Sequence, residues 1–464
     1  MEQLDKKTIL FEQTPVPKAV AQLAVPTILS SLVMVLYNLA DTYFVGQLND
    51  PVQNAAVTLA APVLLAFNAV NNLFGVGSSS MMSRALGRKD YDTVYKSSAF
   101  GFYCSILCGM LFSVFYFLLR VPLLTVLGAD AQTAASTTGY LTWTTGLGAV
   151  PAILNVVMAY LVRSEGASLH ASIGTMSGCL LNIILDPIFI LPWGFHMGAA
   201  GAGLATCLSN CVALLFFLVV LARMGRGSII TFSPKAGLPQ RSSIVAVFGV
   251  GIPSAITTLL FDLDYVVIDK LMVSYHDVAL AAVGIVLKVE RFPLNVGVGI
   301  CQGMLPLVAY NYSAGNQQRM NDAIRLSRRL GLIVAAISIA LYEIFAVQFS
   351  NLFIGDAQTV ELASQFLRIR VLATPLMFLS FFTVYLFQAF GKGRVSLFLG
   401  VTRWLFLNIP MLFILNAIFG MFGIVWSQIT ADTLNVILSF YVYFRFRPSA
   451  NELRPTNTQQ GLKS

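Results

Sequence analysis

Charged residues are scarce in this chain of 464 residues: 11% are charged and 57% are hydrophobic. A soluble protein carries about a quarter charged residues, so this composition does not supply the surfaces of soluble domains. The mean hydropathy is +0.76, and long apolar runs alternate with short polar segments. The runs are apolar on all faces, which excludes the alternating strands of a membrane β-barrel. The sequence therefore predicts an all-α polytopic membrane protein.

Histidine and cysteine are also rare. The three histidines, at positions 170, 196 and 276, are scattered near predicted loops and give no support for a metal centre. The six cysteines all fall inside apolar runs, so we expect neither a disulfide framework nor a CxxC metal site. No soluble catalytic domain is left over, and no paired nucleophile and base lies at membrane depth. We expect a protein that is not an enzyme and that holds no cofactor.

Twelve apolar runs have the length of a membrane-spanning helix, which is about 20 residues. The predicted spans are 19–45, 54–80, 93–119, 136–160, 169–191, 198–222, 245–272, 279–310, 322–348, 362–388, 396–416 and 420–444. Of the 29 basic residues, 22 lie in the tails and in every second loop, Arg120 alone lies in the other loops, and six lie within the predicted spans. Short cytoplasmic loops collect Lys and Arg, so both termini are predicted to be cytoplasmic. Because the basic residues are spread over seven segments, the net charge of +8 does not indicate a nucleic-acid partner.

The two halves of the sequence resemble each other with a period of about 226 residues. Val25-Pro26 matches Ile252-Pro253, Ala131-Gln132-Thr133 matches Ala357-Gln358-Thr359, and Asn182 matches Asn408. Six spans per half is an even number, so the repeat is parallel, with its pseudo-two-fold axis along the membrane normal. The predicted organisation is a tail (1–18), an N-lobe of six helices (19–222), a cytoplasmic linker (223–241, with Pro234, Gly237 and Pro239), a C-lobe of six helices (242–444) and a second tail (445–464).

Two buried carboxylates break this repeat. Asp41 aligns with Val267 or Ile268, and Asp186 aligns with Leu412, so packing alone does not require an acid at either position. By helix rise Asp41, Asp186 and Thr206 lie at one depth below the outer end, and Asn182 shares a helix face with Asp186. Together they predict an oxygen-rich site for a proton or a small hard cation. The alternative is a polar network that only ties the helices together.

Further charges lie at membrane depth in the C-lobe. Asp262 and Asp264 on one span match the depth of Lys288, Glu290 and Arg291 on the next. These five side chains either form salt bridges with each other or handle a substrate or proton. Charges near span ends, such as Arg368 and Arg370, are expected to reach the membrane interface as anchors.

Four sequence strings resemble the multidrug and toxic compound extrusion (MATE) family, and in particular its bacterial MepA-like and DinF-like branch. They are LADTYFVG (39–46), FGVGSSSMMSRALGRKD (74–90), NIILDP (182–187) and LPLVAYNYSAGN (305–316). The resemblance covers nearly the whole chain. It implies a multi-pass transporter in the plasma membrane of a bacterium that exports amphipathic, often cationic organic compounds in exchange for H⁺ or Na⁺.

In this family the cation site of the N-lobe combines an aspartate, an Asn–Asp pair and a threonine, which the resemblance places at Asp41, Asn182, Asp186 and Thr206. The same four residues would be the metal ligands if the ion is Na⁺. The resemblance also implies a hinge at Pro26 in the first helix. Pocket walls are expected at Met34, Tyr37, Asn38, Phe67, Asn68, Asn155 and Met158, because methionine and aromatic surfaces re-pack around varied ligands; core packing is the alternative.

We therefore expect a cation-coupled, alternating-access antiporter. Its expected partners are small amphipathic or cationic molecules and the lipid bilayer, and we expect it to work as a monomer. The nearest alternative is a flippase for lipid-linked precursors, which would be expected to carry extra helices or an arginine-rich cavity. A membrane-embedded enzyme and a channel are the more distant alternatives.

Overall fold

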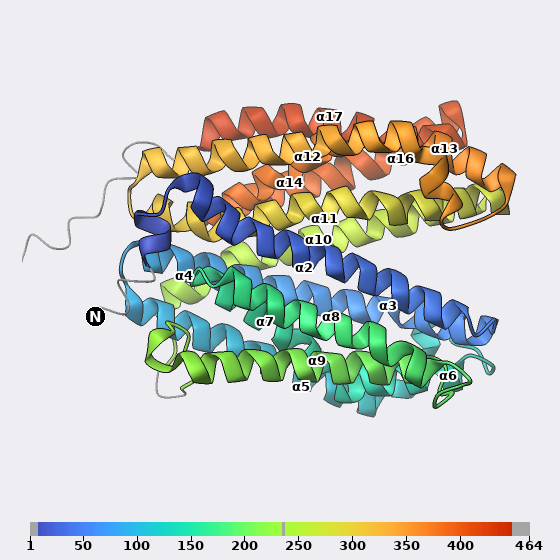
Figure 1. Cartoon of the computed structure of the whole chain (residues 1–464), viewed down its shortest axis with the longest axis horizontal. Coiled ribbons are helices and arrows are strands. Elements are labelled where there is room, and N and C mark those ends of the chain that lie inside the picture. Colours follow the sequence, from blue (N-terminus) through green and yellow to red (C-terminus); the bar gives the residue numbers. More distant parts are fainter. Residues whose placement is uncertain (1–7, 234–236, 448–464) are drawn as a thin grey trace, which may run out of the picture.

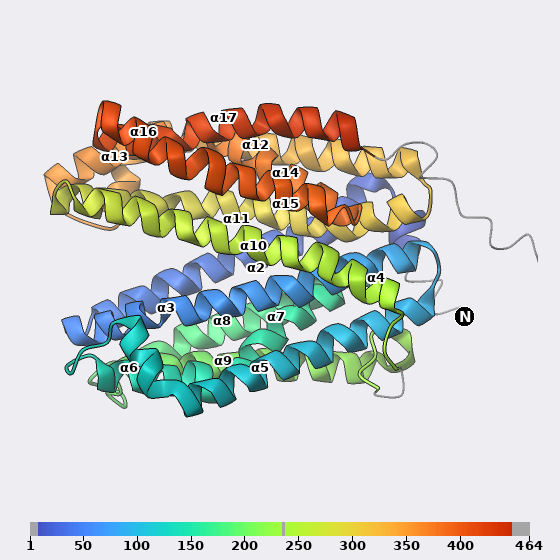
Figure 2. The same cartoon turned by 180° about the vertical axis from the view of Figure 1, so that it is seen from behind.

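The computed structural model of the chain describes residues 8–233 and 237–447, and within them it contains helices and no strand. The helices form two bundles that run side by side along the long axis of the molecule (Figures 1 and 2). The N-lobe consists of α2 (Val16–Gly46), α3 (Pro51–Asn71), the π-helical η1 (Asn72–Val76), α4 (Gly77–Gly87), α5 (Tyr91–Leu127), α6 (Ala134–Leu141), the π-helical η2 (Thr142–Leu147), α7 (Ala149–Ser164), α8 (Ser168–Ile190) and α9 (Ala199–Met224).

The C-lobe follows after the short 3₁₀ turn η3 (Gly225–Gly227). It consists of α10 (Arg241–Val273), α11 (Asp277–Ser313), α12 (Gln317–Asn351), α13 (Ala357–Val371), α14 (Thr374–Ala389), α15 (Gly393–Val401), the π-helical η5 (Thr402–Asn408), α16 (Ile409–Phe419) and α17 (Met421–Phe446). Among the described residues, ten helices are long and apolar enough to cross a membrane, and the number is twelve when each of two helix pairs, bent by 53° and 48°, is taken as one span. The predicted fold class is confirmed.

The helices extend a few residues beyond most predicted spans. For example, the span predicted at 279–310 is the helix Asp277–Ser313, because the polar residues that end an apolar run continue the helical backbone. Within the linker, the backbone of residues 231 and 232 docks on α5, where Tyr103 donates a hydrogen bond to the Phe232 carbonyl (2.6 Å). Residues 1–7, Pro234 and residues 448–464, which belong to the predicted tails and linker, lie outside the described residues.

The internal repeat is visible in two matching helix caps. Asp130 accepts hydrogen bonds from the backbone N–H and the hydroxyl of Thr133, both at 2.8 Å. Asp356 accepts the same two bonds from Thr359, at 2.9 and 2.6 Å. In both loops these bonds lower the pKa of the aspartate, because they favour the ionised form. The repeated sequence Ala-Gln-Thr thus builds the same turn in each lobe.

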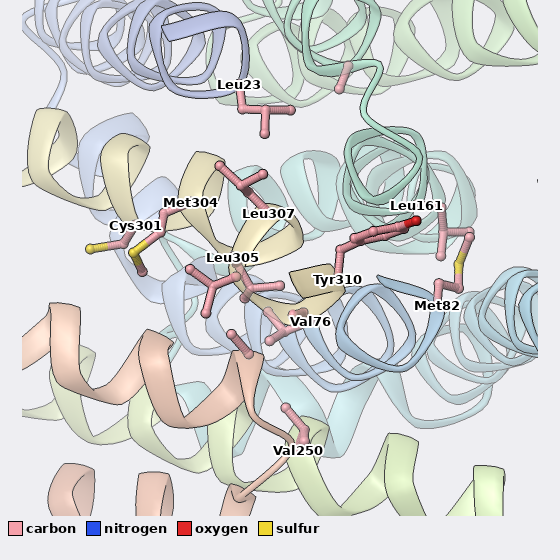
Figure 3. Packing of buried hydrophobic residues seen from close by; sticks show 14 of the residues in the cluster. Leu23, Val76, Met82, Leu161, Val250, Cys301, Met304, Leu305, Leu307 and Tyr310 are labelled. Carbon is pink, nitrogen blue, oxygen red and sulfur yellow. The ribbon is translucent and has the colours of Figure 1, made fainter. Parts of the chain in front are cut away.

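The two lobes meet at one end of the molecule, which we call the basic end because it carries the Arg- and Lys-rich loops (Figure 1). There a single hydrophobic cluster joins Val76, Met82 and Leu161 of the N-lobe to Val250 and Tyr310 of the C-lobe (Figure 3). Toward the opposite end each lobe has a cluster of its own, one around Met272 and Phe366 in the C-lobe and one around Tyr140 in the N-lobe. The lobes are therefore packed together at the basic end and separate at the opposite end.

The most extensive contact between the lobes is the one between α2 and α11, where small residues let the two helices approach closely. A Cβ atom added at Gly303 would lie 2.6 Å from the Ala24 Cα, and one added at Gly299 would lie 2.8 Å from the Ile28 Cα. This spacing of glycines, four apart on one helix, lets two membrane helices approach closely. Pro26 lies between the two contact points on α2, so the predicted hinge is at the interface between the lobes.

The N-terminal segment reinforces this contact at the basic end. Phe11 is fully buried and stacks on Tyr310 with ring centroids 4.9 Å apart. Tyr310 also donates a hydrogen bond to Glu12 (2.6 Å), and Glu12 lies 3.6 Å from Lys89 of the N-lobe. The Arg319 guanidinium at the start of α12 donates to the carbonyls of Leu10 (3.1 Å), Phe11 (2.5 Å) and Thr14. We call residues 8–14, which bridge both lobes, the N-terminal latch.

Candidate functional site

Asp186 on α8 is completely buried in the N-lobe, and Asn182 one turn earlier is 1% exposed. The Asn182 side chain fits its surroundings best with its NH₂ group donating to Asp186 Oδ2 (2.8 Å) and Oδ1 (3.2 Å). Its carbonyl oxygen then accepts from the backbone N–H of Thr206 (3.0 Å) and from the Thr206 hydroxyl (3.3 Å) on α9. Helix spacing produces this arrangement, since residues four apart share a face.

Asp41 on α2 lies close enough to Asp186 for the two carboxylates to repel each other. One Asp41 oxygen, Oδ1, is buried and has no hydrogen-bond partner among the described residues. The structure therefore brings the four predicted cation-site residues together around two carboxylates. Their oxygens can share a proton or hold a small hard cation, because either ligand removes the repulsion between the two charges.

Two tyrosines complete this group. The Tyr37 hydroxyl faces Asp41, Asp186 and Thr206, although the sequence placed Tyr37 in the substrate pocket. Tyr140 lies near both carboxylates and is absent from the prediction. Its position six residues into the span that begins at Ala134 gives it a depth of about 9 Å at 1.5 Å per residue. That depth matches the other site residues, so the same argument would have found it.

A cavity of about 630 Å³ lies between the lobes and reaches toward the opposite end, where they separate. This volume falls in the range of small-molecule sites, about 300–1,000 Å³. On the N-lobe side it is lined by Met34, Asn38 and Thr42 of α2 and by Asn68 of α3. The first three are spaced by four residues, so one face of α2 forms a cavity wall.

The helix α2 separates this cavity from the carboxylate group. Asn38 and Thr42 face the cavity with Met34. Tyr37 and Asp41, one residue before Asn38 and Thr42, face Asp186 inside the N-lobe. One helix thus touches both sites. A rotation or bend of α2 that changes one site must change the other.

Six of the twelve predicted substrate residues line the cavity: Met34, Asn38, Asn68, Asp262, Lys288 and Arg291. The structure places Phe67 and Met158 in the hydrophobic cluster and Tyr37 at the carboxylates. Asn155 is 5% exposed and donates to the Pro151 carbonyl (2.7 Å) and to Asn210 (3.1 Å). The sequence fixes the depth of these residues, whereas the direction in which each points depends on how the helices pack.

The predicted C-lobe cluster is divided between two faces of α10 and α11. Asp262, Lys288 and Arg291 line the cavity together with Asp269. Asp264 and Glu290 point into the C-lobe, where Asp264 is 1% exposed. Residues two apart on a helix lie on nearly opposite sides. These five side chains therefore form two groups, although they lie at similar depths.

Inside the C-lobe, acids and arginines are paired. Arg370 makes two hydrogen bonds with Glu290, at 2.7 and 2.9 Å, and Arg403 of η5 makes two with Asp432, at 2.7 and 3.2 Å. Asp264 accepts a hydrogen bond from Asn408 (2.7 Å) and has no ion pair of its own among the described residues. The prediction that Arg370 is an interfacial anchor is wrong. It is 3% exposed, because the buried Glu290 draws it inward.

The floor of the cavity carries a second unexpected arginine. Arg163 follows the predicted span 136–160, which predicts a position in a cytoplasmic loop, but it is 6% exposed and donates to Gln302 of the C-lobe (3.3 Å). Gln302 in turn donates to the Tyr160 hydroxyl (3.3 Å), and Gln302, Tyr160 and Tyr385 line the cavity. This polar layer lies between the cavity and the basic end. Its depth could not be predicted from the sequence, since Arg163 lies one residue before the end of α7.

The MatE family model matches this chain twice, at residues 26–188 and 242–414. The chain therefore belongs to the MatE family. The second match ends 226 residues after the first, which agrees with the repeat predicted from the sequence.

Two MatE-family relatives match along almost the whole chain. The multidrug export protein MepA of Staphylococcus aureus (strain MSSA476) is 32% identical over 444 residues, which cover 96% of this chain and 97% of that protein. The protein of the same name from Staphylococcus haemolyticus (strain JCSC1435) is 30% identical over 443 residues, 96% of each chain. The expected family and branch are confirmed.

Solved MATE structures share the fold. One, described as the outward-facing conformation of a multidrug resistance MATE family transporter, superposes with a TM-score of 0.89 at 24% identity, over 97% of this chain and 99% of that one. Another, a MATE in the straight conformation, gives a TM-score of 0.88 with the same coverage and identity. At this identity the likeness establishes the two-lobe, twelve-helix fold. The MatE-family chain is thus a multi-pass membrane transporter in fold and family.

Proposed function

We propose that this protein is a cation-coupled antiporter that exports amphipathic, often cationic organic compounds by alternating access, in exchange for H⁺ or Na⁺. The observation that carries the proposal is the position of α2 between the central cavity and the carboxylate pair of the partly buried Asp41 and the buried Asp186. The multidrug export named for the MepA relatives supports the substrate class. The basic end is cytoplasmic by the positive-inside rule, so the cavity belongs to an outward-facing state.

In this state the cation enters from outside and neutralises the repulsion between Asp41 and Asp186. The ion then holds α2 against α8, and the face of α2 that carries Met34 and Asn38 moves relative to the cavity. A bound substrate favours the other arrangement of α2. Coupling requires only that each ligand weaken the other by 1–3 kcal/mol. Pro26 is the proposed hinge of α2, because proline has no backbone N–H and so cannot donate the helical hydrogen bond to the carbonyl four residues earlier.

The chemistry of the cavity fits amphipathic molecules better than a lipid pyrophosphate. Its charged lining residues are two acids, Asp262 and Asp269, and two bases, Lys288 and Arg291, all on the C-lobe wall. A pyrophosphate would be repelled by both acids and has only two cationic partners. The remaining wall offers methionine, asparagine and aromatic side chains, which adapt to varied ligands. This disfavours the flippase alternative.

Transport in proteoliposomes with pH and Na⁺ gradients imposed separately tests the proposal. We expect one gradient to drive uptake of a lipophilic aromatic cation such as ethidium into inside-out vesicles, and Asp41→Asn to abolish the gradient-driven part. Asp92→Asn is the matched control, because Asp92 is 67% exposed and its one ion pair among the described residues is with Lys96. Gradient-driven uptake that is equal in Asp41→Asn and wild type would refute the cation site. Transport of a lipid-linked pyrophosphate without a cation gradient would support the flippase instead.

A further inference from the structure

A groove that no part of the transport cycle uses lies between α12, α14 and α17 in the C-lobe. The helix α14 packs against both α12 and α17 and forms the floor of this groove; the three helices lie together in the upper half of Figures 1 and 2. Its walls include Leu379, Phe382 and Leu386 of α14 and Val436 of α17. These side chains make the groove apolar.

The groove lies near the basic end of the bundle. Leu386 is three residues from the end of α14 at Ala389, and Ser439 is seven residues from the end of α17 at Phe446. At 1.5 Å per residue these positions are about 5–10 Å from the helix ends. That is the depth at which lipid headgroups meet the acyl chains.

Two polar groups in the groove have no partner. Arg328 of α12 lines the groove and has no hydrogen bond or ion pair within the described part of the chain. The Ser439 hydroxyl is buried, its residue is 3% exposed, and it also has no hydrogen-bond partner there. The two buried arginines inside the C-lobe, Arg370 and Arg403, are both paired with carboxylates. A cation at membrane depth costs free energy unless it is paired. We therefore expect Arg328 to pair with an anion from outside the chain.

We propose that this groove binds an anionic phospholipid of the cytoplasmic leaflet. The lipid phosphate accepts charge-assisted hydrogen bonds from the Arg328 guanidinium, and the Ser439 hydroxyl donates to an oxygen at the glycerol backbone. An acyl chain lies along Leu379, Phe382 and Leu386. Basic pockets between helices on the cytoplasmic side are known to favour such headgroups, and the apolar walls favour a lipid over free phosphate.

Native mass spectrometry of the full-length protein, purified in mild detergent with phosphatidylglycerol or phosphatidylcholine added, tests this site. We expect wild type to retain one phosphatidylglycerol about tenfold more tightly than phosphatidylcholine, and Arg328→Gln to lose that preference. Arg328→Lys should keep most of it, which separates lost charge from misfolding. Arg329→Gln is the matched control, because Arg329 is exposed and lies outside the groove.

Three results would overturn the proposal. The first is equal retention of both lipids by wild type, which needs no variant. The second is an equal loss of preference in Arg328→Gln and Arg329→Gln, which would indicate a diffuse basic surface. The third is displacement of the bound lipid by glycerol phosphate at the same concentration, which would show that the site recognises the phosphate without the acyl chains.

Discussion

The N-terminal latch is expected to hold the lobes together at the basic end, and Arg319→Gln tests this contact. The guanidinium donates hydrogen bonds to three backbone carbonyls, those of Leu10, Phe11 and Thr14. A hydrogen bond from a charged group contributes about 1.5–3 kcal/mol, and this arginine is partly accessible to water. We therefore expect the loss of the network to shift the equilibrium between the two facing states by about 2–3 kcal/mol, which is roughly 30- to 150-fold.

Double electron–electron resonance between spin labels at Gln47 and Ser274 measures this shift. Both residues are exposed at the opposite end, one on each lobe, so the distance between them is long when the lobes are separated there. In a cysteine-free background, we expect Arg319→Gln to reduce the long-distance population and to slow export. The control is Arg325→Gln, because Arg325 is 64% exposed and pairs only with Asp322. An unchanged distance distribution in Arg319→Gln would refute the role of the latch.

Three further predictions concern the lobe contact, the buried ion pairs and the cavity. Gly303→Val should force α2 away from α11, because even a Cβ would lie 2.6 Å from the Ala24 Cα. The distance between labels at Gln47 and Ser274 should then become shorter. An unchanged distance distribution would contradict this packing. Asp432→Ala should destabilise the protein by about 3–5 kcal/mol in thermal unfolding, because it leaves the buried Arg403 without a counter-charge, and an unchanged melting temperature would contradict that reasoning. Asp262→Asn should weaken binding of ethidium several-fold in a fluorescence titration, with Asp277→Asn, outside the cavity lining, as the control; equal affinity in both variants would remove Asp262 from the substrate site.

Hydropathy and the spacing of basic residues predicted the fold class and the twelve spans, because the bilayer fixes helix length and the cost of exposed charge. Matching residues about 226 positions apart predicted the repeat. Depth alone also grouped Asp41, Asp186, Asn182 and Thr206, which the structure brings together. Each lies on a helix that packs inside the same lobe, so depth and proximity coincide there.

Depth along a helix did not predict which residues are in contact where the direction of the side chain decides its neighbours. Asp262 and Asp264 have nearly the same depth, yet one lines the cavity and the other is bonded to Asn408. Arg370 lies near a helix end in the sequence, but its helix pair is bent by 48° and the side chain reaches the buried Glu290. A single sequence contains the period of each helix but not the rotation of one helix relative to another.

In the proposed mechanism, substrate in the cavity and a cation at Asp41 compete through α2. Release of the ion on substrate binding measures this most directly, with purified protein in weakly buffered detergent solution for H⁺ and with isotope-labelled Na⁺ for sodium. Saturating ethidium should release one of the two ions from wild type and from Asp92→Asn, and neither from Asp41→Asn. Undiminished release from Asp41→Asn, or no release of either ion from wild type while ethidium still binds, would contradict the account.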